Sequence, residues 1–341
     1  MGYGKKVFCV LCLGCIGFVQ AQDSQSILTK HVTNQNLALI INKSDPVSVE
    51  IGAYYKKKRR IPDKHVVAIN LDTNSAILSP ESFGQIKEYI DSKLPHYIQA
   101  YAITWITPYR VGCMSITSAL ALGYKNEYCS SGCDYTKRSS YYNADSSRSL
   151  SDYGVKPAMV IGASTLSATK RLIDRGIRAD GTFPDGTAYL LDTSDKARNV
   201  RAPIFFKARE IFGSKIKVQV LKANYLRGKS DILFYFTGLV EVPQLETNTF
   251  LPGAVGDHLT SFGGMLADSY HMSSLKWLDA GATGSYGTVV EPCNYIEKFP
   301  NPIVLMSWYL KGDTLIEAYW KSVAMPGQGI FIGEPLATPY R

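Results

Sequence analysis

Several residues of the types that carry out nucleophilic hydrolysis stand close together in the last third of the chain. Asp257, His258 and Ser261 occur in "GDHLTSFGG", and Glu291 and Cys293 occur in "TVVEPC". A cysteine attacks acyl carbons once a neighbouring base generates its thiolate. This set therefore predicts a thiol hydrolase in which Cys293 is the nucleophile and His258 the base, with Ser261 as a second candidate nucleophile.

Strand geometry limits how these residues can cooperate. Adjacent side chains on a strand point to opposite faces, so Asp257 is a poor partner for orienting the imidazole of His258. Glu291 lies on the same side as Cys293 only if the strand continues, and Pro292 indicates that it ends. Backbone N–H groups of "FGG" and "TG" could bind an oxyanion. The alternative is that Cys293 is a buried thiol and His258 a hydrogen-bonded core residue.

The elements around these residues follow a regular alternation of apolar runs and amphipathic helices. Residues 36–42, "NLALIIN", predict a strand buried on both faces, and a helix follows that Ser44 or Asp45 can cap. The same alternation runs through most of the chain. It predicts an α/β fold with a mainly parallel sheet and helices on both faces.

In an open parallel sheet, ligands bind just beyond the carboxyl ends of the strands. The polar residues at the predicted strand ends are therefore candidate ligand-binding groups. The guanidinium groups of Arg110 and Arg198 can bind a carboxylate or phosphate with two hydrogen bonds. The alternative is that these arginines form salt bridges with Asp192 or Asp195. The candidates are Arg110, Asp195, Arg198, Thr237, Gly238 and Gly263.

The beginning of the chain predicts a secretory signal peptide at residues 1–21. Lys5 and Lys6 are followed by the apolar residues 7–19, and Val19-Gln20-Ala21 fits a cleavage site; "CLGC" makes a lipoprotein a lesser alternative. Residues 22–341 then form a single α/β domain, periplasmic or extracellular, with no transmembrane segment. A net charge of +8, which includes Lys5 and Lys6, is too small to predict nucleic-acid binding by an exported protein.

Four cysteines remain after the signal, and an even number can pair fully in an exported protein. Cys129 and Cys133, in "CSSGC", are close enough in sequence to bridge, and Cys113 is nearby, whereas Cys293 stands alone. The pairing stays open. Residues 124–153, rich in Ser and Tyr, predict a long surface excursion.

Metal and cofactor chemistry have weaker signals. Metal-ligand residue types recur near the predicted site, which keeps a metal-dependent hydrolase as an alternative, but no HExxH, paired CxxC or EF-hand spacing is present. No GxGxxG follows the first strand and there is no P-loop, so no cofactor is expected. The ligand-type residues are Asp257, His258, His271, Glu291 and Cys293.

Three longer stretches resemble a family of exported bacterial proteins found in genomes that encode the PEP-CTERM/exosortase sorting system. They are "PGAVGDHLTSFGG", "WLDAGATGSYGTVVEPCNYIEKFP" and "LIEAYWKSVAMPGQGIFIGEPLA". "NKSDPVSVEIGAYYKKKRRIP" resembles the N-terminal part, so the likeness covers nearly all of the mature chain. This conserved hypothetical family implies export and brings no established activity.

The order of elements also resembles caspase-like cysteine peptidases, especially the gingipain type, in which one strand ends in His-Gly and the next in the nucleophilic Cys. "DILFYFTG" takes the place of the first strand, with Thr237 where the histidine would stand. "AVGDHLTSFGG" takes that of the second, with Ser261 or Phe262 where the cysteine would stand, and "AGATGSYGTVV" resembles a later strand beside the pocket. The resemblance therefore implies a caspase-like layout that lacks the catalytic His–Cys dyad of these peptidases.

These observations predict an exported protein that binds or processes a peptide-like ligand at the cell envelope. A scaffold does not fix an activity. An active thiol hydrolase using Cys293 and His258 is the first alternative, and a metal-dependent hydrolase is the second.

Overall fold

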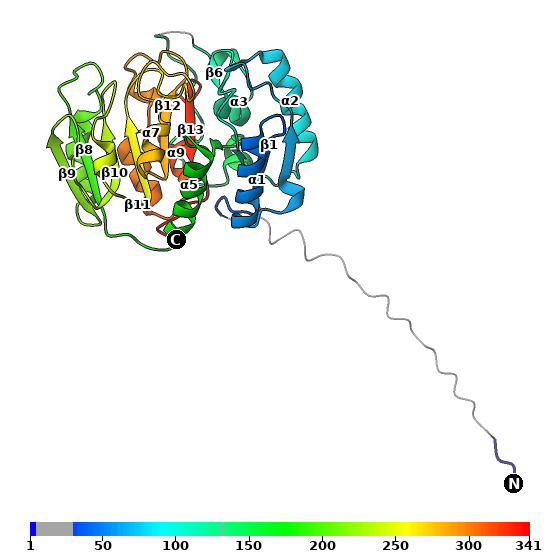
Figure 1. Ribbon diagram of the computed structural model, residues 1–341. Helices are drawn as coiled ribbons and strands as arrows, with labels where there is room; N and C mark the ends of the chain where they lie inside the picture. Colours follow the sequence, from blue (N-terminus) through cyan, green and yellow to red (C-terminus); the bar gives the residue numbers. More distant parts are fainter. Residues whose placement is uncertain (5–29, 131–132) are drawn as a thin grey trace.

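A ten-stranded sheet forms the centre of the molecule in a computed structural model that describes residues 1–4, 30–130 and 133–341 (Figure 1). Its strands, in order across the sheet, are β2 (Val66–Ile69), β1 (Leu37–Asn42), β4 (Ala100–Ile103), β7 (Ala158–Val160), β13 (Gly329–Gly333), β12 (Gly284–Thr288), β11 (Phe250–His258), β10 (Ile232–Thr237), β8 (Thr187–Asp192) and β9 (Lys217–Lys222). Most neighbours pair in parallel, and β12 and β13 pair antiparallel. The predicted mainly parallel α/β sheet is confirmed.

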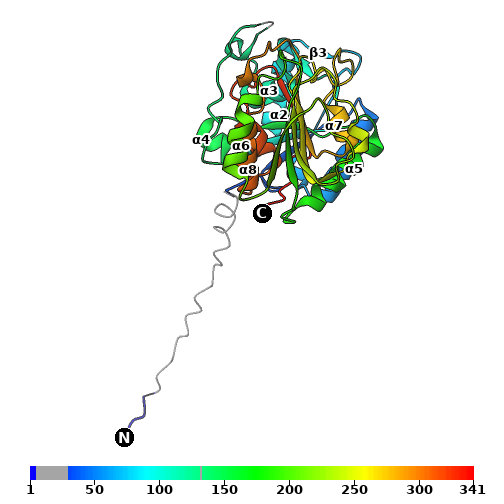
Figure 2. The same ribbon diagram turned by 90° about the vertical axis from the view of Figure 1, so that its left-hand side faces the viewer.

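Helices cover both faces of this sheet, also as predicted (Figure 2). One face carries α1 (Pro46–Arg59), α5 (Leu166–Ala179) and α7 (Leu275–Ala280), and the other carries α3 (Ile116–Leu122), α6 (Phe205–Phe212), α8 (Pro302–Leu310) and α9 (Leu315–Ser322). The remaining helices are α2 (Pro80–Lys93), beside β2, and α4 (Ser149–Tyr153).

Smaller elements complete the described part of the chain. A three-stranded sheet holds β3 (Ile77–Leu78), β5 (Arg110–Val111) and β6 (Met114–Ser115). Short 3-10 helices are η1 (Asp63–His65), η2 (Asn126–Tyr128), η3 (Ala202–Ile204), η4 (Leu245–Thr247) and η5 (Ile296–Lys298).

The first strand and helix show how local sequence forms these elements. Leu37 to Ile40 have no exposed surface, because helices cover both faces of β1. The side chain of Asp45 accepts the backbone N–H of Val47 at 2.9 Å and so caps α1. Pro46 fills the first turn, where its missing N–H costs nothing.

The loops after the parallel strands gather at one edge of the sheet, here called the carboxyl edge. α5 leaves the end of β7, and Ala179 at its far end packs beside Gly253 near the start of β11, so β7 and β11 run in the same direction. After β4, the Tyr109 hydroxyl donates to Asp268, which follows β11, at 2.7 Å. Residues from distant loops therefore meet at this edge.

β13, the last strand in the chain, lies in the middle of the sheet. It pairs with β12 along five residues, Gly329 to Gly333, and meets β7 at Ile332. The ring of Phe331 stacks on Trp320 of α9, with centroids 4.3 Å apart. This central position joins the strands from the first half of the chain to those from the second.

Two disulfides pin the long segment 124–153. They join Cys113 to Cys129 and Cys133 to Cys293. Cys129 and Cys133 are therefore not paired with each other, and Cys293 does not stand alone. The sequence missed this because spacing says nothing about where a long loop folds back.

The predicted signal peptide falls almost wholly within residues 5–29, outside the described residues, and stays a prediction. In the described part of the chain, no helix combines the length and apolar character needed to cross a bilayer.

Gly329 tests the packing of β13. A Cβ at this position would lie 1.8 Å from the hydroxyl oxygen of Tyr286, whose ring is buried. We expect Gly329→Ala to lower the free energy of unfolding by about 1–3 kcal/mol because the core must shift. Gly84→Ala is the matched control, since nothing lies within 4 Å of a Cβ there, and it should gain roughly 0.5–1 kcal/mol in a helix. Urea unfolding measures both, and equal effects would contradict this packing.

Candidate functional site

The predicted pair of Cys293 and His258 is not formed. Cys293 is bonded to Cys133 and so offers no thiolate. The His258 ring is buried, its Nδ1 accepts Trp277 Nε1–H at 2.9 Å, and its Nε2 donates to the Met272 carbonyl at 3.1 Å. Burial lowers the pKa of His258 to about 3, so the ring stays neutral. His258 is a hydrogen-bonded core residue, the alternative that the sequence left open.

Asp257 points to the opposite face, as strand alternation requires. It has no exposed surface, and its carboxylate lies 2.5 Å from Arg201 Nη1. Burial raises the pKa of Asp257, and the Arg201 cation opposes that rise. Arg201 also donates to the carbonyls of Thr237, at 2.8 Å, and Pro300, at 3.1 Å. Asp257 thus anchors an arginine rather than orienting a histidine.

Ser261 and Glu291 do come together, but as a structural pair. The Ser261 hydroxyl donates to Glu291 Oε1 at 3.0 Å, and the same oxygen accepts the backbone N–H of Cys293 at 2.8 Å. The carboxylate holds the turn that carries the disulfide. Its acidic partner gives Ser261 no imidazole base, so the prediction of Ser261 as a nucleophile is not supported by this geometry.

The predicted ligand-binding residues lie at the carboxyl edge, where each contacts other parts of the protein. Arg198 pairs with Asp195 at 3.0 Å, the predicted alternative to ligand binding. Gly238 packs against the backbone of Arg198, where a Cβ would lie 2.0 Å from the carbonyl oxygen. Arg110 donates to the Val289 carbonyl at 3.4 Å.

The other two predicted ligand-binding positions contribute main-chain groups. The Thr237 carbonyl accepts from Arg201, as described above, and the Gly263 carbonyl accepts the Ser274 N–H at 2.8 Å. The Thr237 hydroxyl is buried and has no hydrogen-bond partner among the described residues.

His271 has a sharper role than the sequence indicated. Its Nδ1 lies 2.8 Å from Thr260 Oγ1, and that oxygen accepts Arg198 Nε–H at 3.3 Å. The Thr260 hydroxyl can either donate its proton to Nδ1 or accept Nδ1–H through its second lone pair. In both cases the Thr260 hydroxyl links the His271 ring to Arg198. The two residues are eleven positions apart, and no local pattern marks the pair.

A cavity of about 830 Å³ opens beside His271 on the α7 side of the carboxyl edge. Its walls are the loop after β10, residues 240–246, the loop after β11, residues 266–273, and part of α7. The strand-end argument predicted ligand-binding groups at this edge, but none of the six residues that it named lines the cavity. The loop residues could not be assigned from sequence because they belong to no periodic element.

The cavity is strongly acidic. In the described part of the chain none of its carboxylates lies within salt-bridge distance of a lysine or arginine. The lining cation is Lys276. The carboxylates belong to Glu241, Glu246, Asp268 and Asp279.

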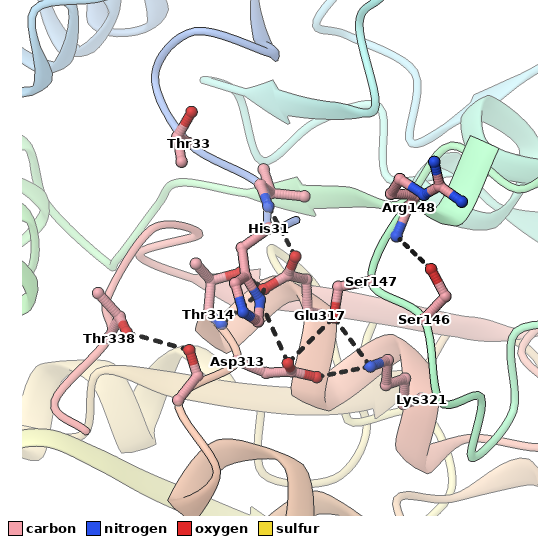
Figure 3. Close-up of polar contacts among 12 residues, drawn as sticks. His31, Thr33, Ser146, Ser147, Arg148, Asp313, Thr314, Glu317, Lys321 and Thr338 are labelled. Atoms are coloured by element: carbon pink, nitrogen blue, oxygen red, sulfur yellow. Dashed lines mark hydrogen bonds and ion pairs between the residues drawn. The ribbon is translucent and has the colours of Figure 1, made fainter. Parts of the chain in front are cut away.

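A second polar cluster lies at the opposite edge of the sheet (Figure 3). His31 Nδ1 is 3.4 Å from carboxylate oxygens of both Asp313 and Glu317. Lys321 Nζ lies 2.7 Å from Asp313, and Glu317 accepts the backbone N–H of Val32 at 2.6 Å. All but His31 are buried.

Within the described residues, His31, Asp313 and Glu317 form the one group of three that could hold a metal ion. The ammonium of Lys321 already supplies a cation there, so we interpret the cluster as a clasp between the N-terminal segment and α9. The metal ligands predicted from sequence do not gather, because Asp257 and His258 face opposite ways and Cys293 is in a disulfide.

Comparisons of the chain with protein-family models, curated proteins and solved structures found no match. Both family resemblances therefore stay predictions.

Thiol chemistry separates the two interpretations of Cys293. Residues 22–341, exported and purified without reductant, should show no alkylation by iodoacetamide in the native state, because all four cysteines are paired. Reduced and unfolded protein should take up four equivalents, which mass spectrometry counts. Alkylation of Cys293 in native protein would restore it as a candidate nucleophile.

The clasp predicts a pH dependence of stability. Burial lowers the pKa of His31, and so does the charge of Arg341. The hydrogen bonds to Asp313 and Glu317 raise it by more than these effects lower it, so the pKa lies above the ordinary 6.5. A histidine whose pKa is higher in the folded than in the unfolded protein stabilises the fold. This stabilisation is fully present below the unfolded-state pKa and is lost as the pH rises through the folded-state pKa. Wild type should therefore exceed His31→Gln in free energy of unfolding by more at pH 6 than at pH 9.

Urea unfolding at both pH values measures this difference. The exposed His96 offers a control, since His96→Gln removes a histidine outside the clasp. An identical wild-type advantage at pH 6 and pH 9 would contradict the clasp.

Proposed function

We propose that this chain is a non-catalytic, exported binding protein that holds a peptide-like ligand, through a basic side chain, in the carboxyl-edge cavity. The observation that carries the proposal is the acidic cavity of about 830 Å³ beyond the ends of β10 and β11. Disulfide-bonded cysteines and the lack of a membrane-spanning helix among the described residues are compatible with export. We place the protein in the periplasm or outside the cell.

The lining of the cavity suits a peptide. Its volume falls in the range of about 300–1,000 Å³ that small-ligand sites occupy. Because the Nδ1 of His271 is bonded to Thr260, its Nε2 is the ring nitrogen that a ligand can hydrogen-bond, and the Tyr270 ring, 79% exposed, presents a face to a cation. The unpaired carboxylates of Glu241 and Glu246 attract a lysine or arginine side chain.

Binding fits the named residues better than processing does. Cys293 is in a disulfide, His258 has both ring nitrogens occupied, and Ser261 bonds to a carboxylate. The Thr260–His271 pair has hydrogen-bond geometry, but the Thr260 side chain is 1% exposed and a ligand carbonyl cannot reach it. The missing dyad of the caspase-like resemblance supports the same proposal.

Charge substitution tests the proposal. A fluorescent pentapeptide with a central lysine should bind residues 22–341, and the same peptide with glutamate should not. The double variant Glu241→Gln/Glu246→Gln should weaken binding of the lysine peptide roughly two- to thirtyfold, since exposed ion pairs contribute about 0.2–1 kcal/mol each. Fluorescence polarisation measures the affinities.

The control keeps the change in net charge but moves it away from the cavity. Glu88→Gln/Glu210→Gln alters two exposed glutamates on α2 and α6 and should leave the affinity unchanged. Equal weakening by both double variants would point to general electrostatics and argue against this site, as would equal binding of the two peptides.

A further inference from the structure

A second cavity, of about 190 Å³, lies on the other face of the sheet, between η3, η5 and the start of α8. It is lined by two arginines, Arg138 and Arg201, and by apolar side chains that include Val200, Ile204 and Phe299. The proposed function assigns nothing to this cavity, and the cavity does not share a lining residue with the acidic one.

Arg201 brings a buried donor to this cavity. Its side chain is 2% exposed, and its two terminal nitrogens bond to Asp257, Thr237 and Pro300. Its Nε–H, however, has no hydrogen-bond partner among the described residues. Buried donors without an acceptor are rare in folded proteins, and a ligand oxygen in the cavity would supply the missing acceptor.

Two further residues that line this cavity carry hydrogen-bond donors, Arg138 and Asn301. The guanidinium of Arg138 lies 5.3 Å from the centre of the Tyr142 ring and, within the described residues, joins no ion pair. Asn301 uses Oδ1 to cap α8, accepting the N–H groups of Ile303 and Val304, so its amide nitrogen remains a donor. The cavity therefore offers hydrogen-bond donors from three side chains.

The charge and shape of the cavity select among anions. Glu297 also lines it, and Asp257 lies behind Arg201, so two carboxylates offset the charge of the two arginines. With so little excess positive charge, the cavity repels a dianion such as phosphate more than a monoanion. The apolar walls suit a ligand with a hydrocarbon body. At about 30 Å³ per water molecule, the cavity holds the volume of roughly six waters.

We propose that this second cavity binds a small organic monocarboxylate, whose oxygens accept hydrogen bonds from Arg201 Nε and from the Arg138 guanidinium. The short apolar body of the ligand packs against Val200, Ile204 and Phe299. Arg201 is held in place by Asp257 on β11, so the buried ion pair of the sheet positions the donor that meets the ligand.

Isobutyrate is a suitable probe, with isobutyramide as its neutral isostere. Ligand-observed NMR with residues 22–341 should show saturable binding of isobutyrate and none of isobutyramide. Arg138→Gln should weaken isobutyrate binding about tenfold or more, because a hydrogen bond to a charged partner is lost. Glu297→Gln should tighten it by roughly two- to fivefold, because a repelling charge is removed.

Arg171→Gln, at an exposed position on α5, controls for net charge and should change nothing. Glu241→Gln/Glu246→Gln should leave isobutyrate binding intact, which separates this site from the peptide cavity. Unfolding midpoints confirm that each variant is folded. Equal binding of acid and amide, no saturable binding, no effect of either Arg138→Gln or Glu297→Gln, or tighter binding of inorganic phosphate would each overturn the proposal.

Discussion

The pairing of β13 between β7 and β12 is the interaction on which the rest of the structure depends. β7 ends at Val160 and β12 begins at Gly284, and without β13 each would present an open row of backbone groups. The last strand of the chain thus closes the centre of the sheet. Because Phe331 also packs between Trp320 and Tyr286, this closure fixes helices as well as strands.

The two edges of the sheet differ in how their charged groups are paired. At the edge opposite the carboxyl edge, buried charges hold distant segments together: Arg59 lies 2.5 Å from Glu334, which also accepts the Tyr55 hydroxyl at 2.7 Å. The His31 clasp acts in the same region. Separating the two partners of such a buried ion pair leaves a buried charge without a counter-charge, which is unfavourable. The pairs therefore favour a single arrangement of the chain. At the carboxyl edge the carboxylates of the acidic cavity lack lysine and arginine partners within the described residues, and two of them, Asp268 and Asp279, accept hydrogen bonds from Tyr109 and Ser164.

The sequence predicted the features that follow from hydrophobic periodicity, such as the strands and the parallel sheet. It did not predict the features that depend on how the loops fold. Continuous apolar runs indicated β1 and the parallel sheet, and strand alternation predicted that Asp257 and His258 would diverge. The Cys133–Cys293 disulfide joins residues 160 positions apart, and no spacing rule could place them. The lining of the acidic cavity comes from irregular loops, for which the same limit holds.

The Asp257-His258 pair has a role in both cavities, although it is not a catalytic pair. On β11 the two side chains point to opposite faces. His258 donates to the carbonyl of Met272, which lines the acidic cavity, whereas Asp257 holds Arg201, which lines the second cavity. One strand thus supports a wall on each face, with a neutral histidine behind the acidic cavity and a carboxylate behind the arginine-lined one. A buried polar residue at a strand end can therefore shape a cavity that its own side chain does not enter.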